Sequence, residues 1–220
     1  RVSFSHITGS SEGLCSGRCE MGFLTEQMET EICQGRCRFR VNPAFDTVLE
    51  VQRLFREQLP ETVKVEQALK MFLINRRRLP CLESQEKVEL LQEIYKECVK
   101  IKQRPAVRQS MPVLDFEEDG EYIYSSFLLD YGIDLIDMQG ILPWKKFVAL
   151  FQGLSERTKI REVMRIRGME IPKYNGKNAK QIQEIQELKS YYALPVKGGG
   201  GQKGLDALFC ALESQAVKNG

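Results

Sequence analysis

The sequence predicts a mainly α protein, a small helical bundle with an N-terminal β-hairpin and flexible ends. Apolar residues recur at intervals of three and four along most of the chain after position 43, as one face of a helix requires. Alternation with period two, which is typical of a strand, is confined to residues 29–41. Apolar residues make up 42% of the chain, which is enough to build a core.

Residues 29–41 predict the hairpin. Ile32 and Cys33 precede Gln34-Gly35, and a glycine supplies the positive φ that a tight hairpin turn requires. After the turn, the residues of one strand face follow with period two: Cys37, Phe39 and Val41.

Three helices are expected after the hairpin, within residues 21–101. Asn42-Pro43 is typical of an N-cap followed by the first helical residue, and Pro60 ends this helix. The second helix covers residues 62–74, and Ser84 caps the third. Their apolar faces are Phe45, Val48, Leu49, Leu54 and Phe55; Val65, Ala68, Leu69, Phe72 and Leu73; and Val88, Leu91, Ile94, Tyr95 and Cys98.

Residues 102–114, which include two prolines, predict a linker to a second helical half at 115–194. Asp115 and Glu118 have the spacing of a capping box, in which two side chains satisfy the free amides of a first turn. Gly132 ends the same helix, because glycine adopts the left-handed conformation that closes many helices.

The remaining helix boundaries follow from similar signals. Pro143 opens a helix that Gly153 ends, and Ser155 and Asn178 cap the last two helices. The apolar faces of the second half are Phe116, Ile123, Phe127 and Tyr131; Trp144, Phe147, Val148 and Phe151; Ile160, Val163, Met164 and Ile166; and Ile182, Ile185, Leu188 and Tyr192, all expected to point inward.

An aromatic contact is expected inside the second half. Trp144 and Phe147 lie on one apolar helix face, and Phe116, Ile123 and Phe127 lie on another. Because apolar helix faces bury one another, we expect Trp144 and Phe147 to pack against the second face.

Both ends of the chain lack such patterns. Residues 1–20 are rich in Ser, Gly and Cys and precede Met21, so we expect either a non-native extension or a disordered tail. Residues 195–220 contain a Gly-rich linker and then a short amphipathic segment. The apolar residues of that segment are Leu205, Leu208, Phe209 and Leu212.

Composition excludes several classes of protein. The net charge of +2 argues against a strong field for nucleic acid or an anionic membrane. No stretch reaches the roughly 18 apolar residues of a membrane-spanning helix. An odd count of seven cysteines, with no secretory h-region near the start, predicts a reducing cytosol.

Chemical motifs are scarce, so we expect no enzyme and no cofactor. His6 is the only histidine, which leaves a Ser-His-Asp or Cys-His arrangement without its base. The Gly198–Gly201 run lacks the Lys-Ser/Thr that follows a phosphate-binding loop.

Metal binding is also not expected. Cys15, Cys19, Cys33 and Cys37 form two pairs at spacings that zinc tolerates. The first pair lies in the doubtful N-terminal stretch, however, and the second flanks a tight turn. Asp130, Asp134 and Asp137 have helical spacing, but a glycine interrupts the helix between them, and Asp134 is better placed as a cap.

A basic stripe is the clearest charged feature. Arg157, Arg161 and Arg165 recur every four residues on one predicted helix, with Lys159 and Arg167 beside them. Three interpretations remain open: a solvated face, contact with phosphates, or contact with acidic groups. The acidic groups belong to another subunit, to a partner protein, or to this chain at Asp115, Glu117, Glu118, Asp119 and Glu121.

From about Met21 to Leu194 the chain resembles the bacteriophage gene product fifteen family. The matching segments, in order, are the Gly35 hairpin; Asn42-Pro43-Ala44-Phe45; Asp115-Phe116 with Asp119 and Tyr122; Tyr131-Gly132-Ile133-Asp134-Leu135; Trp144 with Phe147; Leu154 to Lys159; and Ile166-Arg167. The resemblance implies a tail assembly chaperone, encoded beside the tape-measure gene, that acts in the host bacterial cytoplasm. Its implied partners are the tape-measure protein and also tail-tube subunits.

Six residues are the candidates for partner binding on this interpretation: Trp144, Phe147, Phe151, Arg157, Arg161 and Arg165. The main alternative is a helical nucleic-acid-binding regulator that uses the arginine stripe on phosphates, and a weaker one is a zinc-dependent structural module. The near-neutral charge disfavours nucleic acid. Self-association stays open.

Overall fold

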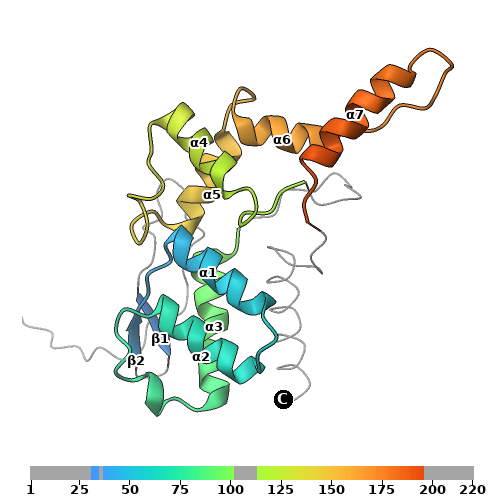
Figure 1. The fold of residues 1–220 in the computed structure, drawn as a ribbon. Coiled ribbons are helices and arrows are strands. Elements are labelled where there is room, and N and C mark those ends of the chain that lie inside the picture. The colour runs from blue at the N-terminus through green and yellow to red at the C-terminus, as the bar shows by residue number, and fades with distance from the viewer. Residues whose placement is uncertain (1–30, 35–36, 102–112, 196–220) are drawn as a thin grey trace, which may run out of the picture.

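The computed structural model describes residues 31–34, 37–101 and 113–195 (Figure 1). These ranges form a helical bundle with one antiparallel hairpin, which confirms the predicted fold class. The elements are β1 (Glu31–Gln34), β2 (Cys37–Arg40), α1 (Phe45–Arg56), α2 (Glu61–Phe72), the 3₁₀ turn η1 (Leu79–Cys81), α3 (Ser84–Ile94), the π-helical turn η2 (Tyr95–Val99), α4 (Gly120–Tyr131), α5 (Trp144–Gly153), α6 (Lys159–Gly168) and α7 (Ala179–Tyr191).

Several predicted features lie outside the described residues. They are the N-terminal stretch at residues 1–20, most of the predicted linker, and the amphipathic segment after Gly201. The glycine expected at the hairpin turn, Gly35, lies outside them too. Among the described helices, none combines the length and the hydropathy that a membrane crossing requires.

The hairpin follows the predicted alternation. Ile32 of β1 lies opposite Phe39 of β2, and both side chains are buried. Cys33 lies opposite Arg38 on the other face, where both are exposed. One face of the hairpin therefore joins the core and the other meets solvent, as a period of two requires.

The chain between β2 and α1 runs extended between two other parts of the molecule. Val41 forms an isolated bridge with Leu73, and Asn42 N donates to the Phe72 carbonyl over 2.8 Å. Ala44 forms a second bridge with Pro143. This strap, residues 41–45, thus joins the end of α2 to the start of α5.

The strap corrects the predicted start of the first helix. Asn42 is not an N-cap: α1 begins at Phe45, and Ala44 occupies the N-cap position. The Asn42 side chain instead donates to the Gly140 carbonyl over 3.1 Å. Pairing on both sides keeps residues 42–44 extended, so Asn42-Pro43 precedes the helix without starting it.

Other cap predictions are displaced by a few residues. The N-cap of α3 is Glu83, which forms a capping box with Glu86, one residue before the predicted Ser84. The N-cap of α6 is Thr158 and not the predicted Ser155. Ser155 instead begins a turn before the helix, in which its carbonyl accepts from Thr158 N at 3.1 Å. In both cases a polar residue near the boundary offers a competing cap.

The predicted capping box at Asp115 forms a single turn ahead of α4. The Asp115 carboxylate accepts from Glu117 N at 2.9 Å, and the reciprocal acceptor is the Asp119 carboxylate, 2.9 Å from Asp115 N. Glu118, which we predicted for that role, is exposed. Asp119 takes that role and also pairs with the buried guanidinium of Arg167, and α4 begins only at Gly120.

The end of α4 agrees with the sequence. Gly132 has φ of 64°, and its N–H donates to the Leu128 carbonyl at 3.1 Å, the closure expected of a left-handed glycine. Asp134 then caps the next turn, since its carboxylate accepts from Ile136 N at 2.9 Å. Hydrogen bonds from the Ile136 amide, the Tyr124 hydroxyl and the Asp137 amide lower the pKa of Asp134.

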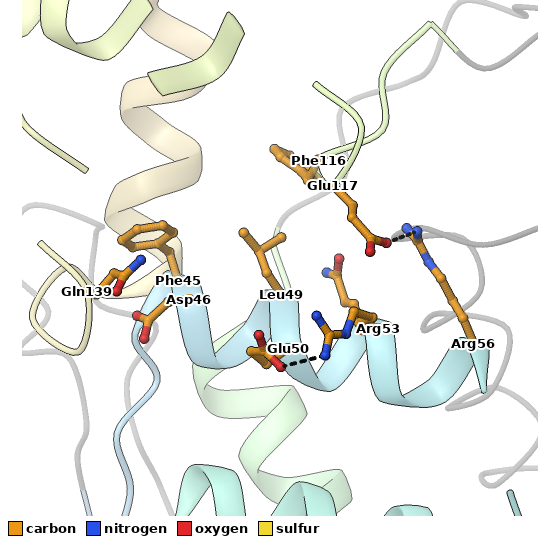
Figure 2. Close-up of a pocket in the computed structure, with 10 residues that line it drawn as sticks. Phe45, Asp46, Leu49, Glu50, Arg53, Arg56, Phe116, Glu117 and Gln139 are labelled. Atoms are coloured by element: carbon orange, nitrogen blue, oxygen red, sulfur yellow. Dashed lines mark hydrogen bonds and ion pairs between the residues drawn. The ribbon is translucent and has the colours of Figure 1, made fainter. Parts of the chain in front are cut away.

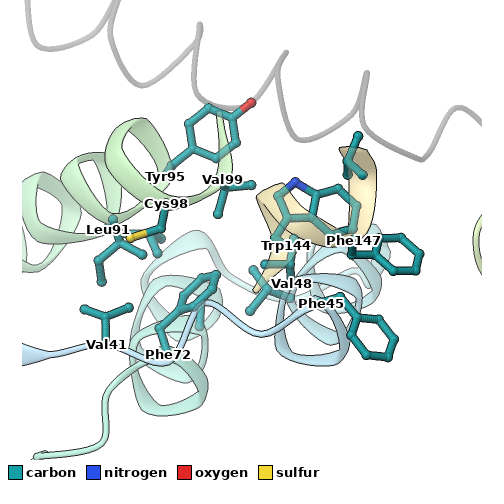
Figure 3. Packing of buried hydrophobic residues seen from close by; sticks show 14 of the residues in the cluster. Val41, Phe45, Val48, Phe72, Leu91, Tyr95, Cys98, Val99, Trp144 and Phe147 are labelled. Carbon is teal, nitrogen blue, oxygen red and sulfur yellow. The ribbon is translucent and has the colours of Figure 1, made fainter. Parts of the chain in front are cut away.

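One core joins the two predicted halves (Figure 3). Phe147 of α5 lies at the centre of an aromatic cluster that reaches α1 and α4. Its ring centroid is 4.9 Å from Phe45, 5.2 Å from Phe127 and 5.6 Å from Trp144. Phe116 packs edge-on against Trp144 at 5.7 Å. The expected burial of Trp144 and Phe147 is confirmed, because each is 1% exposed.

A buried ion pair provides a second tie. The Arg167 guanidinium of α6 donates to both carboxylate oxygens of Asp119, at 2.6 Å and 2.7 Å. Both side chains are buried. Arg167 also donates to the carbonyls of Val113 and Tyr192, so one side chain joins the chain before α4, the start of α4 and the end of α7.

The last helix differs from its prediction. Asn178 stands at the N-cap of α7 as expected, but α7 contributes no buried residue. Ile182 and Ile185 are only half-buried, and Leu188 is 45% exposed. Periodicity predicts that a helix has an apolar face, but it does not show which segment packs against that face. Within the described ranges, no segment buries the apolar face of α7 fully. Helix α7 projects from the bundle in Figure 1.

Replacing Trp144 by alanine should lower the free energy of unfolding by about 3–5 kcal/mol, because a large cavity is left beside Phe147 and Phe116. Chemical denaturation followed by circular dichroism measures it. Within the described residues the indole Nε1 has no hydrogen-bond partner, so Trp144→Phe loses no bond and should cost under about 1.5 kcal/mol. Equal denaturation midpoints for wild type and Trp144→Ala would refute the packing role.

Replacing Arg167 by alanine should cost about 3–5 kcal/mol, because Asp119 is left buried and without its counter-charge. Arg165→Ala, two residues away on the same helix and exposed, serves as the matched control and should change stability by less than about 0.5 kcal/mol. Urea denaturation of both variants tests the pair. Similar midpoints for the two variants would contradict the assigned role of Arg167.

Candidate functional site

The predicted arginine stripe does not lie on one helix. Helix α6 begins at Lys159, so Arg157 precedes it in the turn that Ser155 opens. Arg157 and Arg165 are exposed, whereas Arg161 is half-buried. The three side chains therefore do not form the continuous helical face that their spacing predicts.

Arg161 has a structural task instead. Its Nε donates to the Leu154 carbonyl at 3.3 Å, and an Nη donates to the Gln152 carbonyl at 2.6 Å. These carbonyls lie at the C-terminal end of α5, where a cation satisfies free acceptors and suits the helix dipole. Arg161 thus joins α6 to α5, which corrects the prediction that it presents its charge outward.

Two other basic residues of this segment contact groups within the chain. The Lys159 ammonium donates to the Tyr192 hydroxyl and to Glu162, both at 2.9 Å, and these two contacts raise the pKa of Lys159. Arg167 pairs with Asp119, as described above. One of the three interpretations, contact with the acidic segment of the same chain, therefore holds for Arg167.

The three aromatic candidates lie in the core and not on the surface. Trp144 and Phe147 are 1% exposed and Phe151 is 6% exposed. A partner reaches these rings only if the bundle opens. Their position is explained by the stacking around Phe147, which buries them more completely than an amphipathic helix pattern alone implies.

The metal candidates are also dispersed. Cys33 is exposed on β1 and Cys37 is half-buried on β2, and the two are not register partners. Cys15 and Cys19 lie outside the described residues. Asp130 accepts from the backbone and hydroxyl of Ser155, at 2.7 Å and 3.0 Å, while Asp134 caps its own turn. In the described ranges no cluster of three metal-ligating side chains occurs.

A groove of about 240 Å³ runs along α1 (Figure 2). Its apolar members are Phe45, Leu49 and Phe116, each buried or half-buried. The other lining residues are polar or charged: Asp46, Glu50, Gln52, Arg53, Arg56, Glu117 and Gln139. An apolar strip with charged edges is the surface that takes one face of an amphipathic helix.

Charges along the groove are ordered. Asp46 and Glu50 occupy the N-terminal half of α1, and Arg53 and Arg56 the C-terminal half. Arg56 donates to Glu117 at 3.0 Å and lies 3.4 Å from Asp115. That pairing holds Phe116 and its turn over α1. No sequence pattern predicts the groove, because its walls come from three separate segments: α1, the turn at 116–117 and the loop at 139.

A second exposed surface is the C-terminal arm, which we define as residues 169–192. Four of its large apolar side chains are exposed: Ile171, Tyr174, Leu188 and Tyr191. Its contacts with the bundle lie near the end of α7, where Lys189 Nζ donates to the Arg167 carbonyl and Lys159 Nζ donates to the Tyr192 hydroxyl, both at 2.9 Å.

Comparison with known proteins identifies the family. Neither the curated proteins nor the solved structures gave a match to the chain. The model of the family described as Bacteriophage Gp15 protein matches residues 25–194. This range includes the hairpin, the strap, every described helix and all three segments that line the groove. The chain belongs to the bacteriophage Gp15 protein family.

Proposed function

We propose that this protein is a tail assembly chaperone of a phage or prophage, which binds the tape-measure protein during tail morphogenesis. Family membership over residues 25–194 is the observation that carries the proposal, because it makes this a phage protein. The action takes place in the host bacterial cytoplasm, and tail-tube subunits are proposed as further partners. The protein has no catalytic role and needs no cofactor or metal on this proposal.

The groove on α1 is the proposed contact for the tape-measure protein. Its volume of about 240 Å³ is below the roughly 300–1,000 Å³ typical of small-molecule sites. It suits a few side chains of a helix, whose residues at i, i+3 or i+4, and i+7 would lie over Phe45, Leu49 and Phe116. The charged edges favour a helix whose own charges flank its apolar stripe.

The buried aromatic candidates have a supporting part in this proposal. Phe147 stacks on Phe45, and Phe116 packs on Trp144, so the ring cluster positions two of the three apolar groove residues. Loss of a core ring would then weaken partner binding indirectly, through the shape of the groove.

Substituting Leu49 by glutamate should weaken tape-measure binding about tenfold or more, because a charge would lie in the apolar strip without a partner. The control is Ile74→Glu, an exposed apolar residue outside the groove. Co-expression with the tape-measure protein of the same phage, pull-down and a solubility assay measure binding, and thermal melts check that both variants fold.

Two outcomes would contradict the proposal in different ways. Equal binding by Leu49→Glu and wild type would remove the groove as the contact and leave the chaperone role standing. No complex and no gain in solubility, together with salt-sensitive DNA binding lost in an Arg157, Arg161 and Arg165 alanine variant, would favour the nucleic-acid-binding regulator.

A further inference from the structure

The groove and the arm carry charges in opposite order. Along α1 the groove presents Asp46, Glu50, Arg53 and Arg56 at positions i, i+4, i+7 and i+10, which lie on one side of the helix. From the N-terminal to the C-terminal end, the signs are two negative and then two positive. The span of ten residues corresponds to roughly 15 Å of helix.

The arm has the complementary sequence. Lys177 and Lys180 are followed by Glu184 and Glu187, so the signs are two positive and then two negative over the same ten residues. Lys180, Glu184 and Glu187 have the spacing i, i+4 and i+7 on α7, and all four side chains are exposed. Leu188, 45% exposed, lies one turn after Glu184 and adds an apolar side chain beside them.

Alignment in one direction places opposite charges together along the two helices. If α7 lies parallel to α1, Lys180 meets Glu50, and the two glutamates meet the two arginines. Lys177, which precedes α7, adds a positive charge at the end where Asp46 lies. The antiparallel alignment sets like charges against one another at both ends. Electrostatic complementarity therefore selects the parallel orientation.

The arm cannot reach the groove of its own chain. Lys189 and Tyr192 hold the end of α7 against α6 through the carbonyl contacts at Arg167 and Met169 and the bond from Arg167 to the Tyr192 carbonyl. From this anchor α7 projects away from α1 (Figure 1). A complementary groove must therefore come from a second copy.

We propose that the arm of one copy docks in the α1 groove of a second copy, parallel to α1, in a head-to-tail contact. One end of such an assembly keeps a free groove and the other end a free arm, so the contact extends into a chain or closes into a ring. Asp46 and Arg56 are half-buried and bound within their own copy, Asp46 to Gly140 N and Arg56 to Glu117 and Asp115. The contact therefore depends chiefly on the exposed Glu50 and Arg53, which also pair with each other. It is therefore weak, reversible and sensitive to salt.

The test exchanges charges without altering the net charge. The groove variant combines Glu50→Lys with Arg53→Glu, and the arm variant combines Lys180→Glu with Glu184→Lys. Each variant places like charges together in the proposed contact, so its self-association should weaken roughly tenfold or more relative to wild type. Sedimentation velocity over a range of protein concentrations, at low and high salt, measures this, and circular dichroism checks folding.

A mixture of the two variants distinguishes the proposed arm-to-groove contact from other contacts between copies. In a mixture each swapped arm meets a swapped groove and each native arm meets a native groove, so assembly should return to the wild-type level. A wild type that stays monomeric at all concentrations at low salt would overturn the proposal. So would a symmetric arm-to-arm dimer, which the groove variant would retain. The assay uses this chain alone, so its outcome is independent of tape-measure binding.

Discussion

The extended strap at residues 41–45 is the constraint on which the rest of the structure depends. Its backbone pairs on one side with the end of α2, and on the other side Phe45 N donates to the Leu142 carbonyl and Trp144 N to the Pro43 carbonyl, at 2.9 Å and 2.8 Å. Backbone pairing of this kind sets the distance between chain segments irrespective of side-chain volume. The strap places Phe45, at the start of α1, close to Trp144, at the start of α5. The aromatic cluster fills the space between these two helices.

The buried ion pair between Asp119 and Arg167 joins two helices that no backbone pairing connects. Helices α4 and α6 pack through side chains, and the ion pair sets how the start of one meets the end of the other. A buried pair contributes little net stability compared with apolar packing, but it penalises any arrangement that separates the charges. The same arginine accounts for the placement of the arm, because it also holds the Tyr192 carbonyl.

Local chemistry made the fold class and several boundaries readable from the sequence. Gly132 and Asp134 act through neighbours within a few residues, so their roles could be read without the fold. Asn42 could not be read in this way, because its partners lie near Phe72 and Gly140, far along the chain. The predicted arginine stripe is wrong for a related reason. Arg161 has the spacing of a surface residue, but its guanidinium donates to the free carbonyls at the C-terminal end of α5. The groove has no sequence signal, since three separate segments build it.

The bundle separates its stable parts from its adaptable ones. Aromatic packing and the Asp119–Arg167 pair lie inside, whereas Glu50 and Arg53 of the groove and the charges of α7 are exposed and exchange partners at little cost. If the groove takes a tape-measure helix and the arm of a second copy also fits it, the two occupants compete for one surface. A weak contact between copies would then be displaced wherever a partner helix offers more apolar area over Phe45, Leu49 and Phe116. Exclusion of this kind would let the arm of one copy cover the groove of another until a different partner is present, without any change in the core.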